Sequence, residues 1–130
     1  HPSPLRLGEH GVAEVGEHGT LLGALARTRW PETNLELRPG ETLVAFTDGV
    51  TDTVGEDGER WGSARLQQVL AGTRSLAAPA IKELVVTALD EFQVGAQADD
   101  TALVIMRFTG KSSAQGRSGQ LSGVGARLNG

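Results

Sequence analysis

The sequence predicts an α+β sandwich, in which helices pack as a layer on an antiparallel sheet. Two observations predict this fold class. Strand-like segments joined by short turns come first, and sequential strands with short connections are antiparallel. Two segments with helical periodicity then follow one another, and a last apolar segment has the pattern of a strand.

The first strands are expected on either side of a turn. Residues 5–7 and 12–15 are apolar segments that flank the Gly-containing residues 8–11, a pattern typical of a β-hairpin. The short apolar segment 21–25 is expected to pass over a sheet. Residues 34–38 alternate Leu with polar side chains, which predicts a half-exposed strand.

Two later segments are expected to form buried strands. Residues 39–40 are Pro-Gly, a strong turn signal, and residues 42–47 that follow are apolar on both faces, as in a strand covered on both sides. Residues 101–108 have a run of apolar side chains at their centre and predict another buried strand. We therefore expect both strands near the centre of the sheet.

Between these two strands the apolar period changes to that of helices. Ser63 is a suitable N-cap for a first helix, and Pro79 is a suitable first-turn residue for a second one. Gly95 is expected to end the second helix. The apolar positions recur at helical spacing and are Leu66, Val69 and Leu70, and then Ile81, Leu84, Val85, Ala88, Leu89 and Phe92.

The composition limits the class of protein. The chain has no cysteine, which excludes disulfides and thiolate metal sites and is consistent with a cytoplasmic protein. No apolar run is long enough to span a bilayer, and no signal peptide is visible, so no membrane contact is expected from this segment. Residues 110–130 hold 10 Gly or Ser without apolar periodicity, which predicts a flexible tail outside the fold.

The part of the chain expected to fold is acidic. The sequence has 12 Lys+Arg and 16 Asp+Glu, and three of the basic residues lie in the tail. Residues 1–109 therefore carry nine basic against 16 acidic side chains, a formal charge of −7. Such a balance argues against a nucleic-acid partner.

The first candidate site follows the strand expected over residues 42–47. Asp48 comes directly after this strand, and Gly49 then allows the backbone to turn. A carboxylate at the end of a buried strand is partly desolvated, and a bound cation would offset the cost of burying its charge. The pair has a second interpretation, because Asp-Gly is common in turns that simply end a strand.

The second candidate site precedes the last expected strand. Asp99 and Asp100 are adjacent, and their like charges favour a nearby cation or solvent. Taken alone, the pair is better explained by a solvated turn. Both sites lie beside strands expected at the centre of the sheet, however, so the fold could bring their carboxylates together. Oxygen ligands without His or Cys select hard cations such as Mg²⁺ or Mn²⁺.

The order of the motifs resembles that of the bacterial PPM-type phosphatases, in the SpoIIE-like branch of sporulation and stress-response regulators. The resemblance covers residues 1–109. Its blocks are HPSPL at residues 1–5, TLLG at 20–23, LRPGETL at 37–43, FTDGVTD at 46–52, GERWG at 58–62 and DDTALV at 99–104. The sequence departs from the family pattern at Leu21, where Pro is usual, and at Thr101, which directly follows the acidic pair.

The resemblance implies a fold and a metal site. The family's fold is an antiparallel β-sandwich flanked by helices, and residues 1–109 would be its C-terminal part. Asp48 and Asp99 match metal-ligating aspartates, Asp100 matches the neighbour of the second, and Gly49 would contribute its backbone carbonyl. The family's other ligands belong to an N-terminal motif that this sequence lacks. A two-metal Mn²⁺ or Mg²⁺ site would therefore be completed by residues absent from this chain.

The resemblance also implies an activity. The family consists of metal-dependent protein serine/threonine phosphatases, and a phosphorylated anti-sigma-factor antagonist is the substrate that it suggests. Hydrolysis would use a metal-activated water, with no catalytic residue beyond the metal ligands. Because the N-terminal motif is missing, the chain alone is expected to be inactive. The alternative is a non-catalytic, phosphatase-like module used for interaction.

Overall fold

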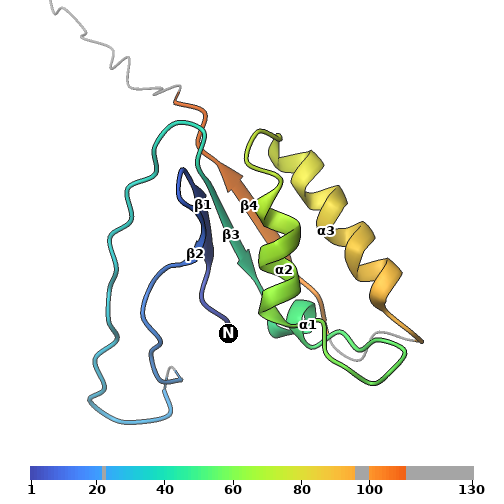
Figure 1. Ribbon diagram of the computed structural model, residues 1–130. Coiled ribbons are helices and arrows are strands. Elements are labelled where there is room, and N and C mark those ends of the chain that lie inside the picture. Colours follow the sequence, from blue (N-terminus) through green and yellow to red (C-terminus); the bar gives the residue numbers. More distant parts are fainter. Residues whose placement is uncertain (22, 96–99, 111–130) are drawn as a thin grey trace, which may run out of the picture.

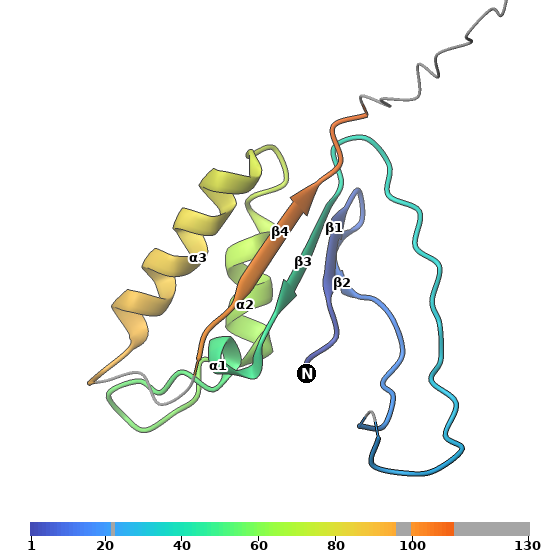
Figure 2. The ribbon, with the colours of Figure 1, turned by 180° about the vertical axis from the view of Figure 1, so that it is seen from behind.

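The structure is a computed structural model that describes residues 1–21, 23–95 and 100–110. Its elements are β1 (Leu5–Gly8), β2 (Gly11–Glu14), β3 (Thr42–Phe46), α1 (Asp48–Thr51), α2 (Gly62–Ala71), α3 (Ala78–Phe92) and β4 (Leu103–Arg107). The four strands form one antiparallel sheet in the order β2-β1-β3-β4, and α2 and α3 lie on one face of it (Figures 1 and 2). The predicted α+β class is confirmed.

The strands β1 and β2 form the expected hairpin. Gly8 pairs with Gly11 next to the turn, and Leu5 pairs with Glu14 at the open end. Gly11 has a φ of +107°, a conformation that other residues rarely adopt, so this turn requires a glycine at that position. The strand β2 lies at the edge of the sheet and is mostly exposed.

The strand β3 is central, with β1 on one side and β4 on the other. The expectation that the last strand is also buried and central is wrong, because β4 lies at the edge of the described sheet and is only partly covered. The side chains of β3 alternate between buried and half-buried, as they do in a sheet with one well covered face. Thr42 lies opposite Arg107 and Phe46 lies opposite Leu103. The start of β3 and the end of β4 therefore lie at the same end of the sheet. The residues after Phe46 therefore lie beside those before Leu103.

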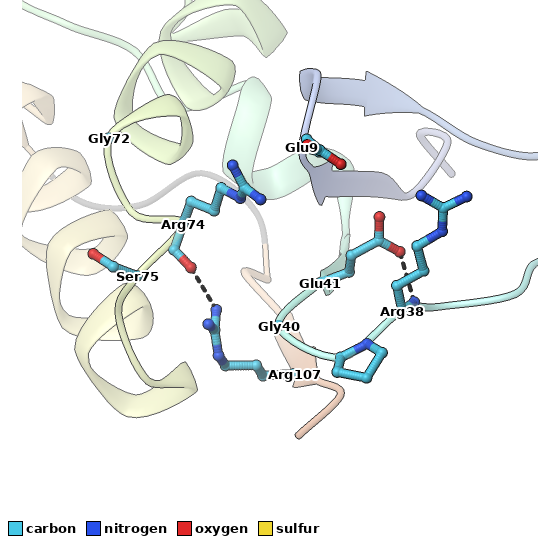
Figure 3. Close-up of a pocket in the computed structure, with 9 residues that line it drawn as sticks. Glu9, Arg38, Gly40, Glu41, Gly72, Arg74, Ser75 and Arg107 are labelled. Atoms are coloured by element: carbon cyan, nitrogen blue, oxygen red, sulfur yellow. Dashed lines mark hydrogen bonds between the residues drawn. The ribbon is translucent and has the colours of Figure 1, made fainter. Parts of the chain in front are cut away.

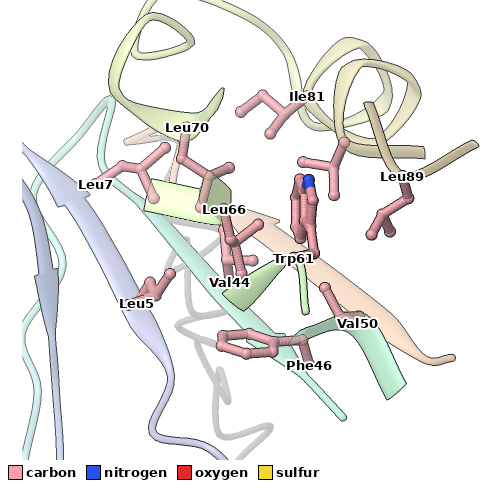
Figure 4. Close-up of a cluster of buried hydrophobic side chains, with 11 residues drawn as sticks. Leu5, Leu7, Val44, Phe46, Val50, Trp61, Leu66, Leu70, Ile81 and Leu89 are labelled. Atoms are coloured by element: carbon pink, nitrogen blue, oxygen red, sulfur yellow. The ribbon is translucent and has the colours of Figure 1, made fainter. Parts of the chain in front are cut away.

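One hydrophobic core lies between the sheet and the two long helices (Figure 4). The helices contribute apolar residues at i and i+4, which places them on a single face of each helix. The core residues are Leu5, Leu7, Val44, Phe46, Val50, Trp61, Leu66, Leu70, Ile81, Val85 and Leu89.

The opposite face of the sheet carries no helix among the described residues (Figures 1 and 2). Val104 and Met106 of β4 are 52% and 49% exposed, whereas Leu103 and Ile105 of the same strand pack against the core. The described residues thus form one sheet with one covered face. The second sheet of the expected sandwich does not occur among them.

Two expectations about the segment between β2 and β3 are wrong. Residues 34–38 form no strand, because an alternating pattern needs a neighbouring strand and these residues pair with none in the described part of the chain. Leu21 and Leu25 are 78% and 62% exposed, so their segment does not pass over the sheet. Leu22 lies outside the described residues.

The helices lie close to their predicted limits. The helix α2 begins at Gly62, which puts Ser63 inside the first turn and not at the N-cap position. The helix α3 carries Pro79 in its first turn, as expected, and ends at Phe92, before Gly95. Among the residues that the structure describes, no helix combines the length and the apolar character needed to cross a membrane.

Candidate metal centre

Asp48 lies where β3 ends and the short helix α1 begins. Thr47 is extended, with φ −88° and ψ 162°, and the chain then turns into α1. Val50 in α1 is fully buried, so it holds this turn against the core, whereas Asp48 is exposed to solvent. The Asp48 carboxylate is therefore carried on a fixed backbone and remains accessible to a ligand.

The second acidic segment lies beside Asp48, because hydrogen bonding between the two chain segments continues past the ends of β3 and β4. The Thr47 N–H donates to Ala102 O at 3.1 Å. The Thr47 hydroxyl accepts from the Ala102 N–H at 2.9 Å and donates to Asp100 O at 3.0 Å. These three hydrogen bonds hold the backbone of Asp100 next to the turn that carries Asp48.

Gly49 permits the close contact between the two segments. A Cβ atom at this position would lie 2.5 Å from Asp100 O and 3.2 Å from Thr101 Oγ1. Gly49 belongs to the helical turn α1 and has no positive φ, so the expectation that it frees the backbone to turn is wrong. Its missing side chain matters instead, because any other residue would push the segments apart.

Local hydrogen bonds hold the backbone carbonyls of α1. The buried Thr53 hydroxyl donates to Gly49 O at 2.9 Å. A carbonyl oxygen has two lone pairs, so this bond leaves Gly49 O able to accept a second partner. Asp48 O accepts from the Asp52 N–H at 2.8 Å and from the Thr51 hydroxyl at 3.1 Å.

The donors in this region fit a hard divalent cation in type. Asp48 and Asp100 carry carboxylates, and oxygen ligands of this kind suit Mg²⁺ or Mn²⁺. Asp99 lies outside the described residues. Within the described ranges, no group of three or more His, Cys, Asp or Glu side chains could hold a metal ion. The described residues therefore supply part of a coordination shell at most.

Thr47 has a structural role that sequence reasoning missed. A threonine before an aspartate is compatible with the end of any strand, so the sequence carries no local signal for it. Its hydrogen bonds to Ala102 and Asp100 become visible only when both segments are in place.

Asp52, four residues after Asp48, forms an exposed ion pair with Arg60 at 2.8 Å. Exposed pairs of this kind stabilise a fold little.

Comparison with known proteins assigns the chain to a family. The family described as Stage II sporulation protein E (SpoIIE) matches residues 1–109. The chain belongs to the SpoIIE family. The predicted resemblance is thereby confirmed, because residues 1–109 match the SpoIIE family and the fold is similar to that of a PP2C domain. A search of curated protein sequences found no match.

A solved structure supports the assignment of this SpoIIE-family chain. The SiaA-PP2C domain of Pseudomonas aeruginosa is similar to it, with 28% sequence identity and a TM-score of 0.70. The match covers 82% of this chain and 42% of that one. The SpoIIE-family chain therefore spans less than half the length of the PP2C-domain chain that it resembles.

Proposed function

We propose that this chain is the C-terminal part of a metal-dependent protein serine/threonine phosphatase domain. One observation carries the proposal: the turn that carries Asp48 contacts the backbone of Asp100 at the ends of two neighbouring strands, β3 and β4. Carboxylates held on a rigid backbone are suited to position divalent cations. The membership of the SpoIIE family supports the same activity.

In this proposal Asp48 and Asp99 are metal ligands, with Asp100 next to Asp99 and Gly49 contributing its carbonyl oxygen. When bound, Mn²⁺ or Mg²⁺ ions at such a site orient a phosphate ester and lower the pKa of a water molecule. Asp48 is exposed, so a phosphorylated side chain of another protein can reach it. The remaining ligands would come from the part of the domain that this chain does not contain.

The proposed substrate is a protein that carries phosphoserine or phosphothreonine. The phosphatase family supports a phosphoprotein as the class of substrate. The resemblance to sporulation and stress-response regulators supports an anti-sigma-factor antagonist in particular. A peptide from such an antagonist, phosphorylated on serine, is the substrate to test first.

The rest of the domain is proposed to supply the second sheet of the sandwich. This chain corresponds to 42% of the SiaA-PP2C chain, and one face of its sheet exposes Val104 and Met106. Without the other part, the metal ligands are incomplete, so we expect no appreciable turnover of p-nitrophenyl phosphate by this chain with Mn²⁺. Robust hydrolysis that disappears in Asp48→Asn would show that the chain is sufficient and would contradict this expectation.

Paramagnetic broadening by Mn²⁺ tests the metal site on this chain directly. We expect the amide signals of residues 47–50 and 100–102 to broaden first in a titration followed by NMR. Asp48→Asn should weaken Mn²⁺ binding at least about tenfold, because even residues that only support a metal ligand contribute that much. Asp90→Asn makes the same change of charge on the exposed surface of α3 and should leave the titration unchanged.

The two variants also separate the proposal from its alternative. If Asp48→Asn and Asp90→Asn titrate alike, Asp48 is not a metal ligand. In a protein that carries the complete domain, we expect hydrolysis of the phosphopeptide to require Asp48. Mn²⁺ binding without any hydrolysis by the complete domain would favour a non-catalytic, phosphatase-like interaction module.

A further inference from the structure

A pocket of about 450 Å³ lies at the end of the sheet opposite Asp48 (Figure 3). The start of β3 and the end of β4 meet there, since Thr42 pairs with Arg107, whereas Asp48 follows the other end of β3. The charged residues that line this arginine pocket are Glu9, Arg38, Glu41, Arg74 and Arg107.

The three arginines of the pocket come from separate segments that the fold brings together. Arg38 precedes β3, Arg74 lies between α2 and α3, and Arg107 ends β4. The Arg107 guanidinium donates from Nη1 to Arg74 O at 2.7 Å and to Thr42 Oγ1 at 3.3 Å, which joins two of the segments. Figure 3 shows Arg38 and Arg74 on either side of Glu41.

The turn that carries Arg38 is also held in place. The Glu41 N–H donates to Arg38 O at 2.9 Å, and the Arg38 N–H donates to Glu41 Oε2 at 2.8 Å. The backbone at Arg38 is therefore well defined, while its guanidinium remains available. The pocket thus has cationic groups carried on ordered backbone, which lowers the entropy lost when a ligand binds.

The positive charge in the pocket is only partly compensated. The Glu41 carboxylate is already paired with Arg6, at 2.7 Å, and its side chain is only 10% exposed. Within the described part of the chain, the guanidinium groups of Arg38, Arg74 and Arg107 form no ion pair, and Glu9 is the one remaining carboxylate of the pocket. Three guanidinium groups thus line the pocket with two carboxylates, Glu9 and Glu41, and the second of these also compensates Arg6, so an excess of positive charge remains.

We propose that the arginine pocket binds a phosphate group. Guanidinium groups donate paired hydrogen bonds in a planar fork that matches the oxygens of a phosphate, and a doubly charged anion would offset the repulsion among three cations. The volume exceeds that of a bare phosphate ion, so a phosphorylated side chain of a protein also fits. The site lies at the opposite end of the sheet from Asp48 and does not depend on the proposed catalytic function.

A titration with inorganic phosphate, followed by NMR, tests the proposal on the whole chain. A chelator keeps divalent metals out of the Asp48 region, so that no phosphate binds there through a metal. We expect saturable shifts of the amide signals of residues 38–41 and 72–75. Arg74→Gln should weaken binding about tenfold, because a charge-assisted hydrogen bond to the anion is lost. Arg29→Gln, which removes the same charge outside the pocket, should leave the affinity unchanged.

A gain of affinity provides a second readout that loss of folding cannot imitate. Glu9→Gln removes the one unpaired carboxylate of the pocket and should raise the phosphate affinity about threefold. Glu17→Gln is the matched control on the exposed chain after β2 and should have no effect. If the wild-type chain shows no saturable shifts, or if Arg29→Gln and Arg74→Gln weaken binding equally, the pocket is not a phosphate site.

The same titration with a phosphoserine peptide identifies the source of the phosphate group. Tighter binding of the peptide than of inorganic phosphate assigns the site to a phosphorylated protein, and equal or weaker binding assigns it to the free ion. Either result retains the proposal. Equal binding of the phosphorylated and the unphosphorylated peptide, without competition by inorganic phosphate, would overturn it.

Discussion

Gly49 and the backbone of Asp100 are in such close contact that a side chain at position 49 has no room. We expect Gly49→Ala to lower the free energy of unfolding by about 1–3 kcal/mol, because its Cβ would lie 2.5 Å from a backbone oxygen that cannot move freely. It should also weaken Mn²⁺ binding by displacing Asp48 relative to Asp100. Urea denaturation and the Mn²⁺ titration measure the two effects.

Gly72→Ala is the matched control for this change. Gly72 follows α2 with a φ of −85°, and a Cβ atom there would meet nothing within 4 Å. The substitution should therefore leave stability within about 0.5 kcal/mol of the wild type or raise it slightly. If both alanine variants are equally stable, the segments of Gly49 and Asp100 do not meet as closely as described.

Glu41 links the stability of the fold to pH. The pKa of Glu41 is lowered from its usual value. The main cause is the hydrogen bond that the Arg38 N–H donates to its carboxylate, and the next is the hydrogen bond from the Arg6 guanidinium. A carboxylate with a lowered folded-state pKa stabilises the fold fully above the unfolded pKa of about 4.3. This stabilisation is lost as the pH falls from there through the folded-state pKa.

Glu41→Gln should therefore lower the free energy of unfolding at neutral pH. It should also make the free energy of unfolding less dependent on pH in the acidic range. The free energy of unfolding in urea, measured from neutral pH to below the lowered pKa, checks both effects. The wild type should lose more stability on acidification than Glu41→Gln does. Glu36→Gln, an exposed change in the same connection, should keep the wild-type pH dependence. Identical acid profiles for the wild type and Glu41→Gln would exclude Glu41 as the group responsible.

The helix α3 has a buried and an exposed valine next to each other. Val85 is fully buried, whereas Val86 is 38% exposed. Val85→Ala should lower the free energy of unfolding by about 2–3 kcal/mol, because it removes buried methyl groups and leaves a cavity. Val86→Ala should stay within about 0.5 kcal/mol of the wild type, since alanine also favours the helix. Equal losses in urea denaturation would show that α3 packs with another face.

The sequence predicted the helix α3 correctly from a long apolar pattern, and a strand at residues 34–38 wrongly from a short one. The apolar period of α3 extends over several turns and placed its buried face correctly on Ile81, Val85 and Leu89. The alternation at residues 34–38 predicted a strand that does not form. An alternating pattern describes what a strand needs on its faces, but pairing requires a neighbouring strand edge, which the local sequence does not reveal.

One face of the sheet is exposed in this chain and is the face that the proposed second sheet would cover. In this chain Val104→Thr should change the free energy of unfolding by less than about 0.5 kcal/mol, because Val104 is 52% exposed. In a protein that carries the rest of the domain, the proposed second sheet would bury the hydroxyl, and the same change should cost about 1–3 kcal/mol.

Comparison of the two proteins by urea denaturation checks this prediction. Val94→Thr, at a 59% exposed position outside the sheet, is the control and should have little effect in either. A small cost of Val104→Thr in both proteins would argue against a second sheet on this face. A large cost in the complete domain alone is the expected result.

The sequence by itself determined the hairpin, the central strand β3, the existence of the strand β4, the two long helices and the family. Each of these follows from a local period of apolar residues or from an ordered set of motifs, and both can be recognised without knowing the contacts. The sequence also placed Asp48 at a strand end, where the structure has it.

Only the tertiary structure decided which segments meet. Thr47 and Asp100 are 53 residues apart, and no local pattern indicates that one hydroxyl joins their backbones or that Gly49 must lack a side chain to allow it. The arginine pocket likewise combines Arg74 and Arg107, 33 residues apart. Strand pairing brings such residues together, and it depends on the register of the whole sheet, which a local period of side chains does not encode.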